Sequence, residues 1–223
     1  MIYKNTVTAE FISRPNRFVA RVMLYGKEET VHVKNTGRCR ELLVPGRRVV
    51  LTPGPGAGRK TDYDLVAVEK PGLGWVNIDS QAPNAVVREY LEKRRKPFGD
   101  VVHIRPEYSY GNSRVDFYMV RKGKEEILLE VKGCTLEIDG VGYFPDAPTQ
   151  RGVKHLQELA AAVSRGYECF IAFVIAMPGV FEVRPNSVTD PAFAEAFDKA
   201  RQAGVKVLFL PCSVSPDSLE IKE

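Results

Sequence analysis

The sequence predicts an all-β domain followed by an α/β domain, and three observations support this division. Over roughly the first 78 residues, short runs rich in Val and aromatic residues alternate with turn signals. From about residue 80, segments with helical spacing alternate with apolar strands. A chain of 223 residues suits one large domain or two small ones. We therefore expect a β domain over residues 1–79 and an α/β domain over residues 80–223.

The first domain contains five runs that are typical of strands, most of them alternating apolar and polar side chains. These runs are VTAEFIS, RFVARVMLY, ETVHVK, RRVVLT and DYDLVAVEK. Turn sequences rich in Gly, Pro and Asn separate them, including TPGPGAG. Five short strands in this length predict a small closed barrel, because closure removes exposed strand edges. An OB-like barrel is the simplest such fold, and OB folds often bind nucleic acids or sugars.

The second domain begins with a predicted helix over residues 80–96. A strand and a hairpin follow, and Thr149 is placed to cap a second helix that runs to Arg165. The apolar run ECFIAFVIAM then predicts a strand that is buried on both faces. Asp190 and Pro191 open a third helix before the last strand, VKVLFLP. This order of elements predicts a mixed sheet with helices on both faces.

Composition and charge narrow the class of protein. The net charge of +4 permits nucleic-acid binding without demanding it. No apolar run is long enough to span a membrane, and the N-terminus lacks the apolar segment of a signal peptide. The four cysteines include no CxxC pair, which argues against a structural zinc site and favours a reduced, cytoplasmic protein. The three histidines lie far apart in the sequence, and we interpret His32, His103 and His155 as structural.

A hairpin over residues 113–136, SRVDFYMVRKGKEEILLEVKGCTL, carries polar residues where strand formers are expected. An antiparallel hairpin that turns near Gly123 places Asp116 opposite Glu130, with Lys132 on the same face. The apolar pattern supports this register, because a shift by one residue would turn every side chain to the other face. The residues that form the opposite, apolar face are Val115, Phe117, Met119, Ile127, Leu129 and Val131.

Two carboxylates on neighbouring strands lie about 5 Å apart at Cβ and repel one another. The compensation can come from Arg114, from Lys132, from a raised pKa or from a bound cation. Two converging carboxylates form the kind of oxygen site that suits Mg²⁺. Lys132 could then hold a hydroxide or a phosphate oxygen beside the metal. The alternative is a ladder of surface charges in which Arg114 and Lys132 merely neutralise Asp116 and Glu130.

Five long motifs carry a resemblance to a known family: RFVARV, VKNTGR, YGNSRVDF, LEVKGCTL and GYFPDAPTQRGVKHLQEL. They resemble the pattern of the sugar fermentation stimulation protein (SfsA) family over residues 6–215. The second domain is also similar to the PD-(D/E)xK nuclease superfamily, although Val115 stands where that signature has Pro. The resemblance implies an OB-like domain joined to a nuclease-like domain. It further implies a DNA-binding protein associated with the regulation of sugar (maltose) utilisation.

The resemblance also assigns roles to residues of the hairpin. It places the metal-binding acids at Asp116 and Glu130, the catalytic lysine at Lys132, and a third acid on the first helix, for which Glu89 is the best candidate. The first functional hypothesis is therefore a nuclease that depends on Mg²⁺ or Mn²⁺. The cation would stabilise charge on the scissile phosphate and lower the pKa of a bound water. Lys132 would orient that water or stabilise the transition state.

The second hypothesis is a DNA-binding protein without catalysis, which grips the phosphate backbone largely without regard to sequence. An acid pair beside a lysine argues for a metal site instead, since carboxylates repel phosphate. A sugar- or nucleotide-sensing regulator is a weaker third possibility, because the sequence has no GxGxxG or Walker motif. Under the nuclease hypothesis, we expect the DNA backbone to contact Gln150, Arg151 and Lys154. Under the binding hypothesis, the barrel would add contacts from Arg14, Arg17, Lys34, Arg38 and Arg40.

Overall fold

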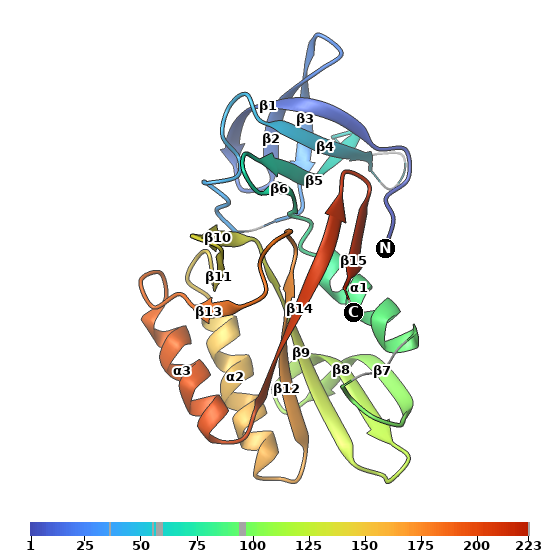
Figure 1. Ribbon diagram of the computed structural model, residues 1–223, viewed down its shortest axis with the longest axis vertical. Coiled ribbons are helices and arrows are strands. Elements are labelled where there is room, and N and C mark those ends of the chain that lie inside the picture. Colours follow the sequence, from blue (N-terminus) through green and yellow to red (C-terminus); the bar gives the residue numbers. More distant parts are fainter. Residues whose placement is uncertain (36, 55, 57–59, 94–96, 223) are drawn as a thin grey trace.

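The computed structural model describes residues 1–35, 37–54, 56, 60–93 and 97–222. A β-barrel lies above an α/β domain in the view of Figure 1, and the chain passes from the first to the second near residue 78. Within the described residues, no helix is long and apolar enough to cross a membrane. All four cysteines are buried and unpaired, so each acts as a small apolar side chain.

The barrel is closed, as the sequence predicts. Its strands pair antiparallel in the order β3-β2-β1-β4-β5, and β3 closes the barrel by parallel pairing with β5. The closing pairs are His32 with Asp64 and Val33 with Leu65. Small aliphatic side chains, chiefly Val and Leu, fill the interior. The strand bounds are β1 Val7–Asn16, β2 Val19–Leu24, β3 Lys27–Val33, β4 Arg48–Pro53 and β5 Tyr63–Lys70.

The second domain is built on a six-stranded mixed sheet in the order β15-β14-β12-β9-β8-β7. The three central strands β14, β12 and β9 are parallel, whereas β15, β8 and β7 pair antiparallel with their neighbours. Strand β12 is buried over nearly its whole length, which confirms the interpretation of its apolar run. The strand bounds are β7 Val101–Tyr110, β8 Ser113–Arg121, β9 Glu126–Cys134, β12 Glu168–Ile175, β14 Lys206–Ser215 and β15 Ser218–Ile221.

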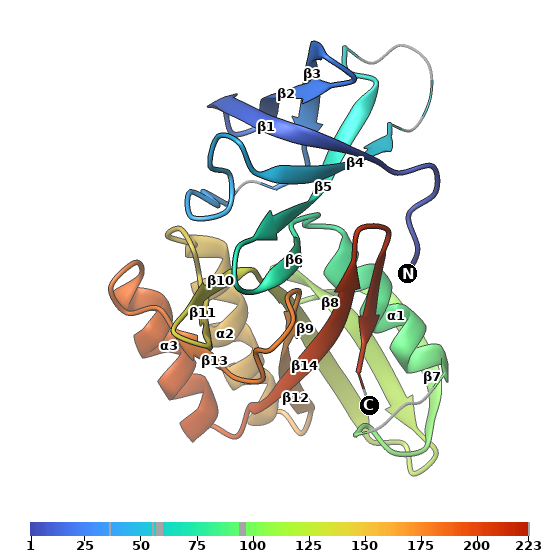
Figure 2. The ribbon, with the colours of Figure 1, turned by 45° about the horizontal axis from the view of Figure 1, so that its top comes forward.

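Helices cover both faces of this sheet, as predicted. Helix α1 (Ala82–Lys93) packs in one apolar cluster with Met119 and Leu129. Helices α2 (Gln150–Val163) and α3 (Pro191–Gln202) pack in another, which includes Leu128 and Phe173. Figures 1 and 2 both show α1 on one side of the sheet and the α2–α3 pair on the other. Alternate residues of β9 thus face opposite helices.

The starts of α2 and α3 are tied together by their caps. The Thr149 hydroxyl accepts from the Gly152 N–H at 3.0 Å, and the Asp190 carboxylate accepts from the Phe193 N–H at 3.0 Å. Asp190 also accepts from the Thr149 N–H at 2.8 Å, so one side chain fixes both helix starts. Helix α2 ends at Val163, slightly before the predicted end at Arg165.

Several short strands were not predicted. Strand β6 (Gly74–Asn77) extends the barrel sheet beside β5, and β15 forms a hairpin with β14. The segment expected as a loop before α2 contains β10 (Leu136–Ile138) and β11 (Val141–Phe144), which form a small sheet with β13 (Val183–Pro185). Such short segments show too few alternations for a periodic signal. Residues 94–96, which the first helix was expected to include, lie outside the described residues.

The two domains meet at the end of β6. The Asn77 N–H donates to the carbonyl of Ala176, directly after β12, at 2.9 Å. The start of the chain crosses this junction too, because the Tyr3 N–H donates to the carbonyl of Asp217 at 2.7 Å. Figure 2 shows the N-terminus beside the β14–β15 hairpin. The first residues therefore contact the second domain, although the sequence groups them with the barrel.

Candidate metal centre

The β8–β9 hairpin has the register that the apolar pattern predicts. Phe117 pairs with Leu129 and Met119 with Ile127, and both pairs belong to the face that packs against α1. The backbone ladder ends at the Phe117–Leu129 pair, one position before the two acids. Beyond this point the Asp116 carboxylate replaces the ladder, since its Oδ2 accepts from the Val131 N–H at 2.7 Å. The acids therefore lie where the two strands diverge.

Two side chains donate to the carboxylate of Glu130. This residue is buried on the face of the sheet toward α2, and its Oε1 accepts from the Lys132 ammonium and from His155 Nδ1. On α2, the Arg151 Nε–H donates to His155 Nε2 at 3.3 Å. Because an arginine can only donate, Nε2 is the acceptor of the imidazole and Nδ1 carries the hydrogen that Glu130 accepts. His155 is thus a neutral donor that fixes the orientation of the acid.

Burial and mutual repulsion separate the acidities of the two carboxyls. Burial, together with the charge of Glu130, raises the pKa of Asp116 to about 6. Burial alone would also raise the pKa of Glu130, but Lys132 and the hydrogen bond from His155 outweigh it and hold that pKa below its usual range. Glu130 is consequently ionised at neutral pH, and Asp116 titrates only slightly below neutrality.

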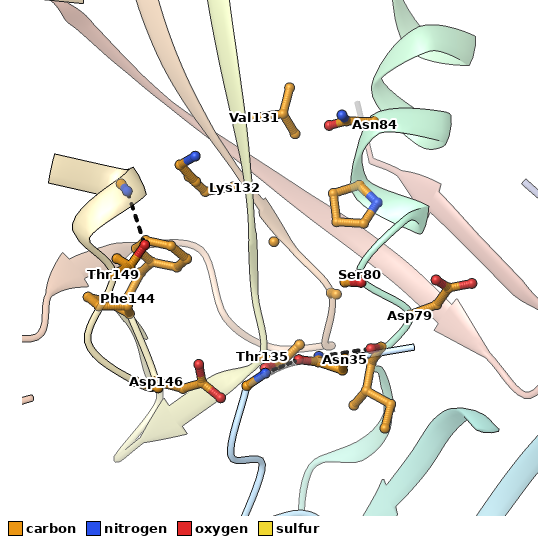
Figure 3. Close-up of a pocket in the computed structure, with 18 of the residues that line it drawn as sticks. Asn35, Asp79, Ser80, Asn84, Val131, Lys132, Thr135, Phe144, Asp146 and Thr149 are labelled. Carbon is orange, nitrogen blue, oxygen red and sulfur yellow. Dashed lines mark hydrogen bonds between the residues drawn. The ribbon is translucent and has the colours of Figure 1, made fainter. Parts of the chain in front are cut away.

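The two acids open into a cleft of about 560 Å³ between the domains. Figure 3 shows Lys132 and Thr149 on one wall of this cleft and Asn84 across from Lys132. The barrel side is formed by Arg17, Asn35 and Gly37. Asn35 is fixed there, because its amide donates to the Ile78 carbonyl at 2.8 Å. The cleft is polar and joins the barrel to the hairpin acids.

The acids fit a hard divalent cation. Among the described residues, the Glu130 Oε2 atom is buried and has no hydrogen-bond partner, which is costly for an ionised oxygen unless a ligand satisfies it. Asp116 still has free lone pairs, since each carboxylate oxygen can accept more than one bond. No group of three or more His, Cys, Asp or Glu side chains with metal-site geometry occurs in the described part of the chain. Mg²⁺ needs only one or two carboxylates, because waters and substrate phosphates complete its shell.

The proposed third acid, Glu89, does not lie at this site. Its carboxylate pairs with the N-terminal ammonium of Met1 at 2.7 Å, on a different side of α1. Asn84, about one and a half turns earlier, takes the position instead, and its Nδ2 donates to Asp116 Oδ1 at 2.7 Å. The expectation for Glu89 was wrong because it depended on the rotation of the helix, which the sequence left open. A neutral amide therefore supports Asp116.

Two of the basic residues expected to contact DNA have structural tasks instead. The Arg14 guanidinium donates to four backbone carbonyls, those of Arg17, Asn35, Gly37 and Arg38, at 2.6–2.9 Å. Lys34 lies 3.0 Å from Asp79 and 3.5 Å from Asp64, and it is largely buried in that ion-pair network. Both side chains thus stabilise the barrel loops through these contacts.

The other six expected contacts form two groups around the cleft. Arg17, Arg38 and Arg40 line a groove on the barrel, and Arg17 also lines the cleft. Gln150, Arg151 and Lys154 lie on the first turns of α2, where they line a groove beside Arg114. Their contact with DNA stays a prediction; of the six, Arg17 on the barrel and Arg151 on α2 line the cleft itself.

Sequence reasoning missed His155 and Asn84 as parts of the site. His155 was interpreted as structural, and it is a buried residue on α2 between the apolar positions that face the sheet. A histidine in such a stripe, opposite a strand that carries an acid, is a usable signal. Asn84 gave no comparable signal, because an amide near a helix start is ordinary.

Comparison with known proteins identifies the family. A model of the SfsA N-terminal OB domain matches residues 12–78, and a model of the sugar fermentation stimulation protein RE domain matches residues 81–218. A sugar fermentation stimulation protein homolog of Desulfitobacterium hafniense is 51% identical over 220 residues, which cover 99% of this chain and 95% of the relative. The chain belongs to the SfsA family. The resemblance drawn from the sequence motifs is thereby confirmed.

Further members of the SfsA family agree with this assignment. A homolog of Clostridium beijerinckii is 45% identical over 223 residues, covering 100% of this chain and 97% of its own. The structure of Pyrococcus furiosus SfsA in complex with Ca²⁺ matches with a TM-score of 0.88 at 30% identity, over 99% of this chain and 96% of that one. The second domain has the helix, three strands, helix and strand expected of a PD-(D/E)xK nuclease-like fold.

Proposed function

We propose that this protein hydrolyses phosphodiester bonds of DNA at Asp116, Glu130 and Lys132 with the help of Mg²⁺ or Mn²⁺. The observation that carries the proposal is the buried Glu130 Oε2, which has no hydrogen-bond partner among the described residues, beside the half-buried carboxylate of Asp116. A cation would offset the repulsion between the two acids and satisfy that oxygen. The Ca²⁺ complex of the Pyrococcus furiosus relative supports a divalent cation in this family.

Each residue of the site has a defined task in this proposal. Asp116 and Glu130 supply the carboxylate oxygens, and Asn84 and His155 hold them in place. The ammonium of Lys132 lies at the cleft, where it can stabilise charge that develops on the phosphate. A divalent cation supplies a polarised water and further charge stabilisation. Hydrolysis forms one P–O bond from water and breaks the ester P–O bond, and the departing oxygen ends as a hydroxyl after taking a proton.

The proposal is tested with purified protein, end-labelled DNA and Mn²⁺. Single-stranded, duplex and branched substrates are each incubated and the products separated by size. We expect cuts that Lys132→Ala loses, while Lys122→Ala, on the exposed hairpin turn, retains them. Both variants should still bind Ca²⁺ in calorimetry. Failure of the wild-type protein to cut any of the three substrates would overturn the nuclease proposal.

A second candidate function is DNA binding without cleavage, linked to the regulation of sugar utilisation. One observation favours it: a neutral amide, Asn84, contacts Asp116 in place of a third acid, and the Lys132 ammonium already offsets the charge of Glu130. Under this alternative, Arg17, Arg38 and Arg151 would hold phosphates, and the affinity would fall steeply with salt. Tight, salt-dependent binding without any cleavage in Mn²⁺ would support it.

A further inference from the structure

The acids of the site are deeply recessed, and this limits what can reach them. The Glu130 side chain is only 3% exposed, and both acids open into the cleft between barrel and sheet. The volume of about 560 Å³ is typical of a pocket for a small ligand, which ranges from about 300 to 1,000 Å³. Such a space accommodates a nucleotide unit of a single strand and excludes the body of a duplex.

An exposed aromatic residue adjoins an arginine that lines this cleft on the barrel side. Phe18, in the turn between β1 and β2, is 45% exposed. The guanidinium of Arg17 stacks over its ring at 4.7 Å, and Arg17 itself lines the cleft. Among the described residues Arg17 forms no ion pair with an acid, so its charge is available to a ligand. Arg17 thus places a planar cation at the cleft that Glu130 also lines, and the Phe18 ring stacks against this cation.

This turn is held firmly by the barrel. Arg14 donates to the Arg17 carbonyl at 2.8 Å and, on the other side, to the carbonyls of Asn35 and Gly37. The Val33 N–H donates to the Phe18 carbonyl at 2.8 Å. The stacked pair is therefore fixed relative to the loop that forms the barrel wall of the cleft. A platform fixed in this way loses little entropy when a ligand stacks on it.

We propose that Arg17 and Phe18 form a stacking platform for an unpaired base, and that the substrate is nucleic acid with a single-stranded segment in the cleft. Unpaired bases stack on aromatic rings and on arginine planes. Inside a duplex, neighbouring bases cover both faces of each base, so no face is free to stack on the protein. The positive charge of Arg17 also attracts the phosphate backbone that leads to the acids. The inference rests on the proposed nuclease function for its substrate role, but the binding itself does not require cleavage.

The proposal is tested by binding without hydrolysis, in EDTA, using fluorescein-labelled oligonucleotides of one sequence in single-stranded, duplex and flapped form. We expect the single-stranded and flapped forms to bind more tightly than the duplex. Phe18→Ala should weaken single-strand binding about 5- to 100-fold, which corresponds to the loss of one stacked base. Tyr25→Ala is the matched control, since Tyr25 is 81% exposed on the same barrel at the opposite end of β2.

A second variant reports on stacking directly. Phe18→Trp should bind the single strand as tightly as the wild type does. The fluorescence of the new tryptophan should be quenched when the strand binds, whereas Trp75, present in both proteins, gives a constant background. Equal affinity for single strand and duplex, or no effect of Phe18→Ala, would overturn the platform. A clear single-strand preference in a protein that never cuts would leave the platform standing and reject only the nuclease proposal. Cutting of fully paired duplex, without any preference for single strands in binding, would support the nuclease proposal and reject the platform.

Discussion

His155 on α2 donates through Nδ1 to Glu130 on β9, and this contact joins a helix of one layer to the acid of the neighbouring sheet. Both residues are buried, so the hydrogen bond forms away from water and involves a charged acceptor. Arg151 donates to the other ring nitrogen, which fixes the tautomer. Helix α2, which carries three of the expected DNA contacts, therefore also aligns the proposed metal ligand Glu130.

We predict that His155→Ala lowers the free energy of unfolding by about 1–3 kcal/mol, because it leaves a buried, charged acceptor with one donor fewer. The same change should weaken Ca²⁺ binding, since Glu130 loses its fixed orientation. Chemical denaturation and calorimetry measure the two effects. His103→Ala serves as the control, because His103 is exposed on β7 and its loss should change stability by less than about 0.5 kcal/mol. Equal effects of the two substitutions would contradict the assignment.

The raised pKa of Asp116 predicts a pH-dependent metal affinity. A cation binds the ionised carboxylate, so protonation competes with binding below the pKa of about 6. Ca²⁺ affinity measured by calorimetry should rise by up to about tenfold per pH unit below pH 6 and level off above it. Asp116→Asn should bind Ca²⁺ weakly at every pH and show no such rise. An affinity that is constant from pH 5 to pH 8 would be inconsistent with a buried acid pair.

The same group affects stability in the absence of metal. Between the ordinary aspartate pKa near 4 and the folded-state pKa of about 6, the native state holds a proton that the unfolded chain has lost. The contribution of Asp116 to the free energy of unfolding therefore falls as pH rises through this window. The difference in stability between the wild type and Asp116→Asn isolates this contribution from other acids. We expect Asp116→Asn to have the higher free energy of unfolding at pH 7, and its advantage over the wild type to shrink toward pH 4.

The hairpin register could be predicted because it depends on a local, alternating pattern. Phe117 and Met119 face the same side as Leu129 and Ile127, and only one parity of pairing brings them together. The ladder ends before Asp116, which no pattern indicated, because the divergence of β8 from β9 depends on how β9 pairs with β12 and β8 with β7. Local alternation thus predicts which face a side chain joins, and tertiary packing decides where pairing stops.

The identity of the third site residue could not be predicted, because it depends on helix rotation. Positions 84 and 89 differ by about 140° around a helix, so only one of them can face a given strand. The apolar stripe of α1 directs the helix onto the sheet, and this rotation turns Asn84 toward Asp116 and Glu89 toward Met1. His155 was missed for a related reason, since its partner on β9 is distant in sequence and the α2–sheet packing alone joins them.

Substitutions at Glu89 and Asn84 give a further prediction. Glu89→Gln removes an ion pair whose acid is 43% exposed, so stability should change by at most about 1 kcal/mol and Ca²⁺ affinity not at all. Asn84→Asp instead adds a third carboxylate beside Asp116. We expect tighter Ca²⁺ binding and lower stability without metal, because the new charge repels Asp116 until a cation binds. Thermal unfolding with EDTA and with Ca²⁺ checks both halves. Loss of Ca²⁺ binding in Glu89→Gln would restore Glu89 as a ligand.

Substitution of Lys132 separates metal binding from catalysis. Lys132→Met removes the ammonium that lowers the pKa of Glu130, and it leaves the buried Glu130 and the half-buried Asp116 with less positive charge beside them. The variant should be less stable than the wild type in EDTA, and Ca²⁺ should restore more stability to it than to the wild type, through mass action. It should nevertheless fail to cut DNA in Mn²⁺. A variant that loses both Ca²⁺ binding and cleavage would show that Lys132 supports the metal site itself.

The barrel loop rests on the second domain through Gly37 and Asp146, and the last prediction concerns this contact. A Cβ on residue 37 would overlap the Oδ2 atom of Asp146, so the loop or the carboxylate must move to admit it. We expect Gly37→Ala to cost about 1–3 kcal/mol of stability, as overpacking does. Because the loop forms the barrel wall of the cleft, this change should also weaken the binding of single-stranded oligonucleotides.

A double-mutant cycle identifies Asp146 as the obstacle. In the background of Asp146→Ala the methyl group that Gly37→Ala adds no longer meets the carboxylate, so this substitution should cost less there than it does alone. The coupling free energy should be at least about 0.5 kcal/mol, the value that separates interacting from independent sites. Denaturation curves for the four proteins give this coupling directly. Strict additivity would mean that Asp146 does not obstruct the added methyl group, and Asn35 Oδ1, which lies 2.8 Å from the same Cβ position, would be the obstacle instead.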